Sequence, residues 1–394
     1  MAPPKENVQD QIKDADNVTK YKAAAEVVKV VLKEVVDMCK EGCSVVEICA
    51  VGDSRVNEEA QKVYKKGYTD EESGKTKQIP RGVAFPVCIT LNEMVCHYSP
   101  LRSDEGVTLK DGDVVKIDMG AHVDGFMALA GTTIVVGADA TSPVTGPAAD
   151  VIMAAYNASE AVLRTIKAEK TNFDCTELID QVAEEYGVKA VTGMVSYQIS
   201  KNEIAGAEAK VIPQAPDAER RAQTKKAEFE VGDVFAIDII MSTGDGKPVE
   251  KGGRTTVFKK TNTRFTLRMA TSRAVYSEIS NNFTTMPFSL RACTDEKKAR
   301  MGIVECQKQG LVESYPVMSD KEGALVAQFK YTVMLTSNGV VRLTPSIFDA
   351  ESVKSEKSIE KEELKALLAE EMEVKKKKTN KKKKPKAKTA TTEA

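Results

Sequence analysis

Apolar residues near the start of the chain recur at the three-to-four-residue spacing of a helix. They are Ala24, Val27, Val28, Val31, Val35 and Val36. Asn17 precedes this run and can cap a helix, and Gly42 follows it and can end one. The pattern predicts an amphipathic helix that packs on the core. The stretch 65–78 is charged and contains glycine, so we expect an exposed loop before the apolar segment 83–86.

A short motif occurs twice in the chain. Residues 112–118 read Gly-Asp-Val-Val-Lys-Ile-Asp and residues 232–238 read Gly-Asp-Val-Phe-Ala-Ile-Asp, which agree at five of seven positions. Each copy has the residue order of a turn followed by a strand. Chance similarity is one explanation, because Gly-Asp-Val is common at such turns. The other is a duplicated α/β half, in which Asp118 and Asp238 face a shared cleft from equivalent strands.

Helical patterns separate the two copies of the motif. They run over residues 147–167 and 172–186, where apolar positions again follow the helical spacing. The resulting order of helices, strands, helices and strands lacks regular βαβ alternation. We therefore predict an α/β fold of the α+β type, in which helices flank a mixed or antiparallel sheet.

The composition changes after Ser352. Residues 353–374 are charged and favour a helix, and within them Leu364, Leu367 and Leu368 form an amphipathic pattern that nuclear receptors bind in a groove. The alternative is a helix packed on its own domain. We expect a disordered lysine-rich tail over 375–394, which is too charged to fold, and a flexible N-terminus over 1–17.

Charge is distributed unevenly along this 394-residue chain, whose 42% hydrophobic content allows a substantial core. The formal net charge is −1, but residues 375–388 hold ten lysines, which leaves 47 basic and 57 acidic groups in residues 1–374. Within this acidic body, residues 251–301 carry eleven lysines or arginines and three acids. Such a basic island predicts a surface for polyanions, whereas a solvated face is the ordinary alternative for any one lysine.

The eight cysteines raise the question of a metal or disulfide site. No Cys-x-x-Cys pair occurs, and the chain has only two histidines. We expect free, mostly buried thiols in a reducing compartment. The segment 1–16 is polar and charged, which predicts neither a secretory signal nor a membrane helix. The expected location is therefore the cytosol or the nucleus.

Several motifs in fixed order resemble the pita-bread fold of type II methionine aminopeptidases. They are Gly82-Val83-Ala84-Phe85-Pro86, Asn92, Cys96-His97-Tyr98-Ser99-Pro100, the run from Lys116 to Gly125, and Ala327-Gln328-Phe329. The resemblance implies one pita-bread domain over about residues 18–352, with two related halves and a curved, mostly antiparallel sheet. The chain is most similar to the non-peptidase branch, the proliferation-associated or ErbB-binding proteins. Their Glu-Lys-Lys-Ala-Arg-Met-Gly run stands here at 296–302, and their lysine-rich tail follows it.

Active members of that fold hold two divalent ions with carboxylates and one histidine, so that a bridging water becomes a nucleophile near neutral pH. By resemblance, the five ligand positions fall here on Asp118, Leu129, Met194, Asp238 and Lys330. Leucine offers no donor, methionine offers a soft thioether, and lysine places a cation where a bridging carboxylate belongs. The resemblance therefore implies a pseudoenzyme without a metal or other cofactor, in which Lys330 pairs with Asp118 or Asp238.

The two histidines, His97 and His122, are further candidate site residues. His97 matches the substrate-facing histidine of the peptidases, and we interpret it as a structural residue inherited with its loop. His122 precedes Asp124 by two residues in a predicted strand and has the same interpretation. A Ser-His-Asp or Cys-His arrangement could form only around His97, and the sequence shows no nucleophile elbow.

Type II enzymes also insert a helical subdomain between the fourth and fifth ligand positions, and the basic island falls inside it, at about residues 251–315. Phe258, Phe265 and Tyr276 are interleaved with its cations, which suits phosphate contacts and stacking on RNA. The candidate nucleic-acid-binding residues of the insert are Arg254, Lys259, Lys260, Arg264, Arg268, Arg273, Arg291, Lys297, Lys298 and Arg300. Those of the tail are Lys375, Lys376, Lys377, Lys378, Lys381, Lys382, Lys383 and Lys384.

The favoured hypothesis is a non-catalytic protein that binds RNA and the large ribosomal subunit. The resemblance implies association near the nascent-chain exit, entry into the nucleolus, and effects on ribosome biogenesis, translation and growth. One alternative is a DNA-binding transcriptional cofactor that acts through the tail and Leu364–Leu368, because lysine tails bind DNA and RNA alike. The other alternative is a residual metallopeptidase, against which three lost ligand positions argue.

Overall fold

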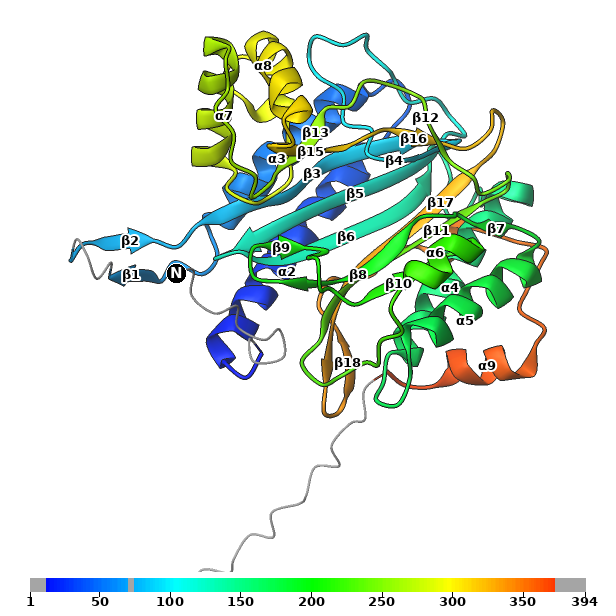
Figure 1. Cartoon of the computed structure of the whole chain (residues 1–394). Coiled ribbons are helices and arrows are strands. Elements are labelled where there is room, and N and C mark those ends of the chain that lie inside the picture. Colours follow the sequence, from blue (N-terminus) through cyan, green and yellow to red (C-terminus); the bar gives the residue numbers. More distant parts are fainter. Residues whose placement is uncertain (1–11, 70–73, 373–394) are drawn as a thin grey trace, which may run out of the picture.

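The computed structural model describes residues 12–69 and 74–372 (Figure 1). Its centre is a ten-stranded antiparallel sheet in the order β10-β8-β11-β17-β6-β5-β3, in which β18 also pairs with β17, β7 with β11 and β9 with β8. The predicted α+β class, with an antiparallel sheet and flanking helices, is confirmed. The strands are β3 (Arg81–Leu91), β5 (Val114–Val123), β6 (Phe126–Val135), β7 (Lys189–Ala190), β8 (Val195–Ser200), β9 (Glu203–Ile204), β10 (Val211–Pro213), β11 (Val234–Ser242), β17 (Val326–Thr336) and β18 (Gly339–Arg342).

The two copies of the repeated motif form equivalent turns and strands. Gly112 and Gly232 both adopt a positive φ, 83° and 111°, and they lead into β5 and β11. In each copy the glycine N–H donates to a carbonyl at the end of the neighbouring strand, and that residue's N–H donates back to the aspartate carbonyl. The partner is Val136 in the first copy and Leu335 in the second. Shared geometry of this kind favours a duplicated half over chance similarity.

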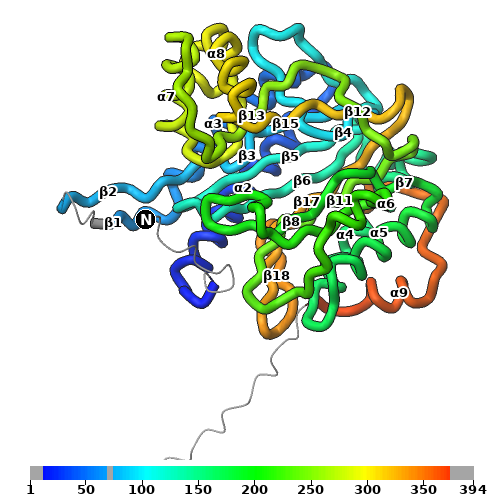
Figure 2. Tube along the Cα trace, viewed as in Figure 1, coloured from blue at the N-terminus to red at the C-terminus, as the bar shows by residue number. Residues whose placement is uncertain are grey.

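Helices cover one face of the sheet, and the charged positions lie on the other. α2 (Ala15–Met38) and α3 (Val45–Ala60) pack on β3, β5 and β6, while α4 (Gly146–Thr165) packs on β11 and β17 and α5 (Asn172–Tyr186) packs on α4. Figure 2 shows the two halves side by side, one in blue to cyan and one in green to orange. The odd-numbered residues of β5, β11 and β17 enter the helix-covered cores. Side chains alternate along a strand, so the even-numbered Asp118, Asp238 and Lys330 point to the opposite face.

Two predicted boundaries at the N-terminal end are wrong. The carboxylate of Asp14, rather than Asn17, caps α2 by accepting the Asp16 N–H, because aspartate is as good a cap as asparagine. The helix ends at Met38, four residues before Gly42. The predicted loop 65–78 contains a hairpin of β1 (Gly67–Thr69) and β2 (Thr76–Gln78). All of β2 is exposed, so no alternation of apolar and polar residues marks it in the sequence.

The insert is not purely helical. A three-stranded antiparallel sheet of β14 (Phe288–Ser289), β13 (Val257–Lys260) and β15 (Val312–Tyr315) accompanies α7 (Ala270–Asn282) and α8 (Glu296–Lys308) (Figure 1). These elements share a core of their own that includes Phe258, Val275, Ile279 and Ile303. A second small sheet joins β12 (Val249–Glu250), β16 (Met318–Ser319) and β4 (Met94–Cys96). The short α6 (Ala218–Gln223) follows β10.

The C-terminal part of the described chain packs on α4. Leu364 of α9 (Glu362–Ala369) is 2% exposed, and Leu368 packs against the same core cluster. This is the arrangement of a helix packed on its own domain, which makes Leu364 unavailable to a partner's groove. The candidate tail lysines lie outside the described residues. No helix in the described ranges is long and apolar enough to cross a bilayer.

Candidate functional site

Three of the five positions that correspond to metal ligands lie in one row across the sheet. In the strand register, Asp118 of β5 lies opposite Gly131 of β6, Gly131 lies opposite Lys330 of β17, and Lys330 lies opposite Asp238 of β11. A Cβ at Gly131 would come within 3.1 Å of Lys330 Cβ. Because β6 carries no side chain at this point of the row, Lys330 can extend over it toward Asp118.

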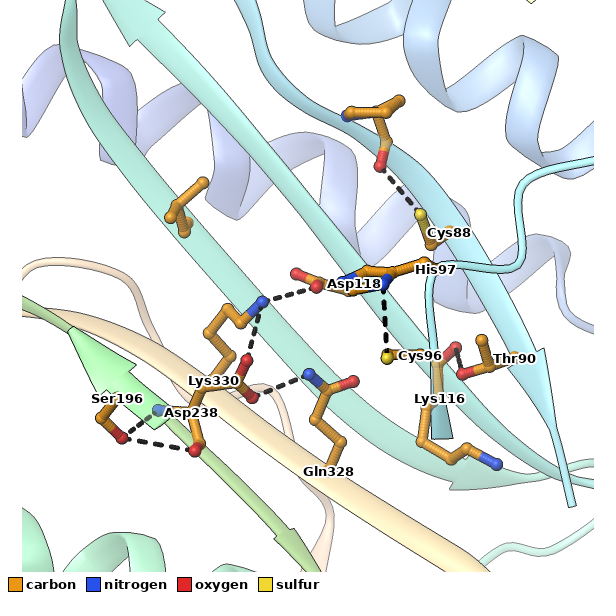
Figure 3. Close-up of polar contacts among 12 residues, drawn as sticks. Cys88, Thr90, Cys96, His97, Lys116, Asp118, Ser196, Asp238, Gln328 and Lys330 are labelled. Atoms are coloured by element: carbon orange, nitrogen blue, oxygen red, sulfur yellow. Dashed lines mark hydrogen bonds and ion pairs between the residues drawn. The ribbon is translucent and has the colours of Figure 1, made fainter. Parts of the chain in front are cut away.

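The ammonium group of Lys330 bridges the two carboxylates (Figure 3). Its Nζ lies 2.5 Å from Asp118 Oδ2 and 3.0 Å from Asp238 Oδ2, and all three side chains are largely buried. Gln328 Nε2 donates to Asp238 Oδ1 at 2.7 Å, which holds the second oxygen of that carboxylate. The ring of Phe85 lies 5.5 Å from Lys330 Nζ. The expected pairing of Lys330 is confirmed, and it includes both aspartates rather than one.

Burial and the neighbouring charges both shift the pKa values of these groups. Burial alone would lower the pKa of Lys330, but the charges of Asp118 and Asp238 raise it well above its usual value. Burial raises the pKa of Asp118 to about 6, the charge of Asp238 adds to this rise, and Lys330 opposes it. Lys330 is therefore charged at neutral pH. Asp118 Oδ1 is buried without a hydrogen-bond partner among the described residues, which leaves part of that carboxylate's desolvation uncompensated.

The other two positions carry apolar side chains. Leu129 of β6 is 1% exposed and fills the space over Gly120, where a Cβ would meet its Cδ2 at 2.3 Å. Met194, which precedes β8, packs in a cluster with Cys96 and Ile240. The set therefore presents two carboxylates, one cation and two apolar groups, which does not fit a pair of divalent ions. Within residues 12–69 and 74–372, no three His, Cys, Asp or Glu side chains gather in a metal-binding group.

His97 lies beside this site in a constrained conformation. Its φ is 66°, and its Nδ1 lies 3.0 Å from the carbonyl oxygen of Pro316, so that nitrogen carries the hydrogen and donates. Its ring contacts those of Phe85 and Tyr315. Burial lowers the pKa of His97 to about 4, which keeps the imidazole neutral. These contacts support the structural interpretation of His97.

Sequence reasoning gave no role to three residues of this face. Gly131 opens the path of Lys330, Gln328 holds Asp238, and Lys116 lies buried two residues before Asp118. Lys116 Nζ donates to the Asn92 carbonyl at 2.8 Å, and burial lowers the pKa of this lysine to about 7. Strand alternation could have placed Lys116 and Gln328 on this face, because each lies two residues from a predicted ligand position. The role of Gly131 depends on the register between distant strands.

The structure separates the cations of the insert into exposed and internal groups. Arg291 is buried, with Nη2 2.5 Å from Asp53 Oδ2 and Nη1 donating to the Pro100 carbonyl, so the prediction that it contacts nucleic acid is wrong. Phe258 is 2% exposed and cannot stack on a base, whereas Phe265 is 46% exposed. Half-buried cations are Lys259, Lys260 and Arg300. Exposed cations are Arg254, Arg264, Arg268, Arg273, Lys297 and Lys298.

All eight cysteines are free, as expected, and most are buried. Burial raises the pKa of the thiols of Cys39, Cys49 and Cys293 to about 12. Thiols that stay protonated are poor nucleophiles and poor metal ligands. They act as small apolar side chains in the core.

Comparison with known proteins places the chain in a family. Residues 19–259 match metallopeptidase family M24. The chain is 40% identical over 368 residues to the curved DNA-binding protein of Schizosaccharomyces pombe, which covers 93% of each chain. It is 43% identical over 364 residues to ErbB-3 binding protein 1 of Arabidopsis thaliana, covering 91% of this chain and 87% of that one.

Two solved structures show the same fold. A thermophilic Arx1 superposes with a TM-score of 0.82 at 32% identity, covering 92% of this chain and all of the other. A methionine aminopeptidase of Thermotoga maritima superposes with a TM-score of 0.53 at 18% identity, covering 85% of this chain and 99% of the other, which shows the pita-bread fold alone. The chain belongs to metallopeptidase family M24, in its branch of ErbB-3-binding and proliferation-associated proteins.

Proposed function

We propose that the chain is a non-catalytic, methionine-aminopeptidase-like protein that binds RNA of the large ribosomal subunit. Its location would be the cytoplasm and the nucleus, including the nucleolus. The observation that carries the proposal is the group of exposed cations on the insert, of which Arg264, Arg268 and Lys297 are examples. The subunit's rRNA near the nascent-chain exit is the proposed partner, and no cofactor is needed for binding.

The buried row of Asp118, Lys330 and Asp238 supports the non-catalytic part of the proposal. A peptidase of this family needs a bridging water between two metal ions, and the position of the bridging carboxylate is here an ammonium bound to Asp118 and Asp238. A divalent ion that entered the site would have to displace this cation from both carboxylates. We therefore expect no release of N-terminal methionine from a Met-Gly peptide in the presence of cobalt or manganese.

The insert has the properties of an RNA-binding surface. Its exposed cations can neutralise phosphates, and the exposed ring of Phe265 lies next to Arg264 in the chain and can stack on an unpaired base. The remainder of the described body is acidic in sequence and repels a polyanion. Binding is therefore expected to be oriented, with the insert toward the RNA.

Co-sedimentation with large ribosomal subunits in a sucrose gradient tests this function. The triple variant Arg264→Glu, Arg268→Glu and Lys297→Glu should lose the complex, because three phosphate contacts become repulsive. The matched control, Lys22→Glu, Lys33→Glu and Lys40→Glu, makes the same charge change at exposed positions outside the insert and should sediment like the unmodified chain. If both variants bound subunits equally well, the assignment of the insert would be wrong.

Binding to DNA is the second candidate function, because one relative is named a curved DNA-binding protein. The same cations would contact the phosphates of either nucleic acid, since phosphate contacts carry little sequence information. Complexes isolated from a lysate should dissociate with RNase and survive DNase. The opposite sensitivity would favour the transcriptional role.

A further inference from the structure

A cavity of about 390 Å³ lies between the insert and the loop that follows β4, away from the row of Lys330. Its lining residues are Ser103, Arg254, Lys297, Arg300 and Met301. Arg300 Nη1 donates to Ser103 Oγ at 3.3 Å, so the guanidinium reaches the serine hydroxyl. Ser103, Arg254 and Lys297 are exposed, and Arg300 is half-buried. Three cations and one exposed hydroxyl thus line the same cavity.

Two carboxylates hold the loop beside this cavity in place. Asp104 accepts a backbone N–H of its own loop at 3.0 Å and lies 3.6 Å from Arg254 Nε. Glu296, the first residue of α8, accepts another backbone N–H of the loop at 3.2 Å. These bonds fix the backbone just before Ser103, whose Oγ lies beside Arg300. The lining carries cations and no acid, so the cavity favours an anion.

We propose that Ser103 is a phosphorylation site, whose phosphate is held by the cations of this cavity and weakens RNA binding by the insert. The second half of this proposal rests on the proposed function. In the modification, Ser103 Oγ forms a bond to the γ-phosphorus of a nucleoside triphosphate, and the bond from that phosphorus to its bridging oxygen breaks. The nucleoside diphosphate leaves, and the hydroxyl proton passes to the general base of the kinase.

A phosphate on Ser103 has the negative charge and the acceptor oxygens that suit the cations of this cavity. It carries a charge of about −1.5 to −2 at neutral pH and three acceptor oxygens. Arg254, Lys297 and Arg300 offer charge-assisted donors to those oxygens, and such bonds are the strong ones. Cations that hold this phosphate are no longer available to the RNA backbone. Three lost contacts should flatten the log-log salt dependence of RNA binding by about two units, at roughly 0.7 per contact.

The test uses the full chain with phosphoserine incorporated at position 103 during synthesis. Its first measurement, a ³¹P NMR titration, involves no RNA. An exposed phosphoserine has a second pKa of about 6, and the three cations should lower it. Arg300→Gln should return it toward about 6. Phosphoserine at Ser337, exposed in the turn between β17 and β18 at the opposite end of the molecule from α8, should titrate near 6 (Figure 1).

The second measurement is RNA affinity against salt concentration. Phosphorylated Ser103 should weaken binding and flatten the salt dependence, whereas Ser103→Ala and the Ser337 phosphate should leave both unchanged. An ordinary ³¹P pKa at Ser103 would overturn the proposal, as would a lowered pKa with unchanged RNA affinity. Absence of phosphate at Ser103 in chain isolated from its own cells with phosphatase inhibitors would also overturn it. If the unmodified chain bound no RNA, the proposed function would fail, while the ³¹P titration would still decide whether the cavity holds the phosphate.

Discussion

At the scale of single residues, one ammonium group joins carboxylates from the two halves of the sheet. Asp118 belongs to the first copy of the repeat and Asp238 to the second, and Lys330 contacts both. Buried ion pairs contribute little net stability compared with apolar residues, because desolvation offsets the attraction. Removal of one partner is costly, however, since the remaining charges stay buried without compensation.

Lys330→Met should lower the free energy of unfolding by about 3–5 kcal/mol, because two carboxylates would face each other in a buried site. Urea denaturation at pH 7 measures this loss. Lys321→Met is the matched control: Lys321 pairs with Asp245 at an exposed site, where solvent screens the pair, so its loss should change the free energy of unfolding little. Combining Lys330→Met with Asp118→Asn and Asp238→Asn should recover part of the loss. If Lys330→Met and Lys321→Met lowered the free energy of unfolding equally, the role of Lys330 as a buried bridge between the two carboxylates would be contradicted.

The two histidines should make stability depend on pH. His97 and His122 have a pKa of about 4 when folded, because burial disfavours their charged form, against about 6.5 when unfolded. As pH falls from about 6.5 toward 4, the unfolded chain takes up protons that the folded chain excludes, so the free energy of unfolding decreases. Asp118, whose pKa is raised to about 6, acts with the opposite sign in this range.

A comparison of variants isolates the effect of the histidines. The double variant His97→Gln and His122→Gln should take up about two fewer protons on unfolding near pH 5 than the unmodified chain. Its free energy of unfolding, measured in urea from pH 4 to 7, should therefore fall less steeply with decreasing pH. If the free energies of unfolding of the two chains differed by the same amount at every pH, the histidines of the folded chain would titrate normally.

At the scale of elements, the repeated Gly-Asp-Val motif and the helical spacing were sufficient to predict β5, β11, α4 and α5. Local patterns carry this information, because turn chemistry and periodicity act within a few residues. The row of Asp118, Gly131, Lys330 and Asp238 was only partly predictable. The resemblance gave its charged members, but the register that places Gly131 between them joins strands about 200 residues apart.

The same limit explains the misassigned residues of the insert. Arg291 looks like its neighbouring cations in the sequence, yet it pairs with Asp53, which is 238 positions away. Phe258 is buried because it packs in the insert's own core with residues of α7 and α8, which no local pattern shows. Exposure of a cation or an aromatic ring therefore has to be taken from the packed structure.

Restoring a metal site requires changes on three elements at once. Leu129→Asp on β6, Met194→His before β8 and Lys330→Glu on β17 together should raise the affinity for cobalt or manganese, because Asp118 and Asp238 remain in place. Each single change should have little effect, since the donor set stays incomplete. Isothermal titration with each ion measures this. Tight binding by Lys330→Glu alone would show that the ligand positions have been misaligned.

At the scale of the whole molecule, an acidic body carries two basic regions, the insert and the lysine-rich tail. The insert presents its cations on packed elements and can match the shape of one RNA site. The tail sequence offers ten lysines within residues 375–388, which can contact phosphates without selecting a site. The two regions should therefore contribute differently to binding.

Deletion of residues 375–394 should weaken binding to the large subunit without changing the place on the subunit where the chain binds. If about half of the ten lysines engage phosphates, the log-log salt dependence should flatten by about four units, at roughly 0.7 to 0.9 per contact. Affinity measured between 50 and about 200 mM salt gives the slope, and crosslinking to large subunits locates the bound chain. If tail deletion abolished the specific crosslinks while the variant Arg264→Glu, Arg268→Glu and Lys297→Glu kept them, the roles given to the two basic regions would be reversed.

The Lys330 bridge also has a consequence for how the protein is made. In a protein whose halves are joined by bound ions, the last step of maturation depends on the supply of those ions in the cell. Here the joining charge is part of the polypeptide, so it is present in every copy as soon as translation ends. Abundance of this protein should therefore be indifferent to metal starvation, a condition under which ion-dependent peptidases of the same shape would accumulate in an incomplete form.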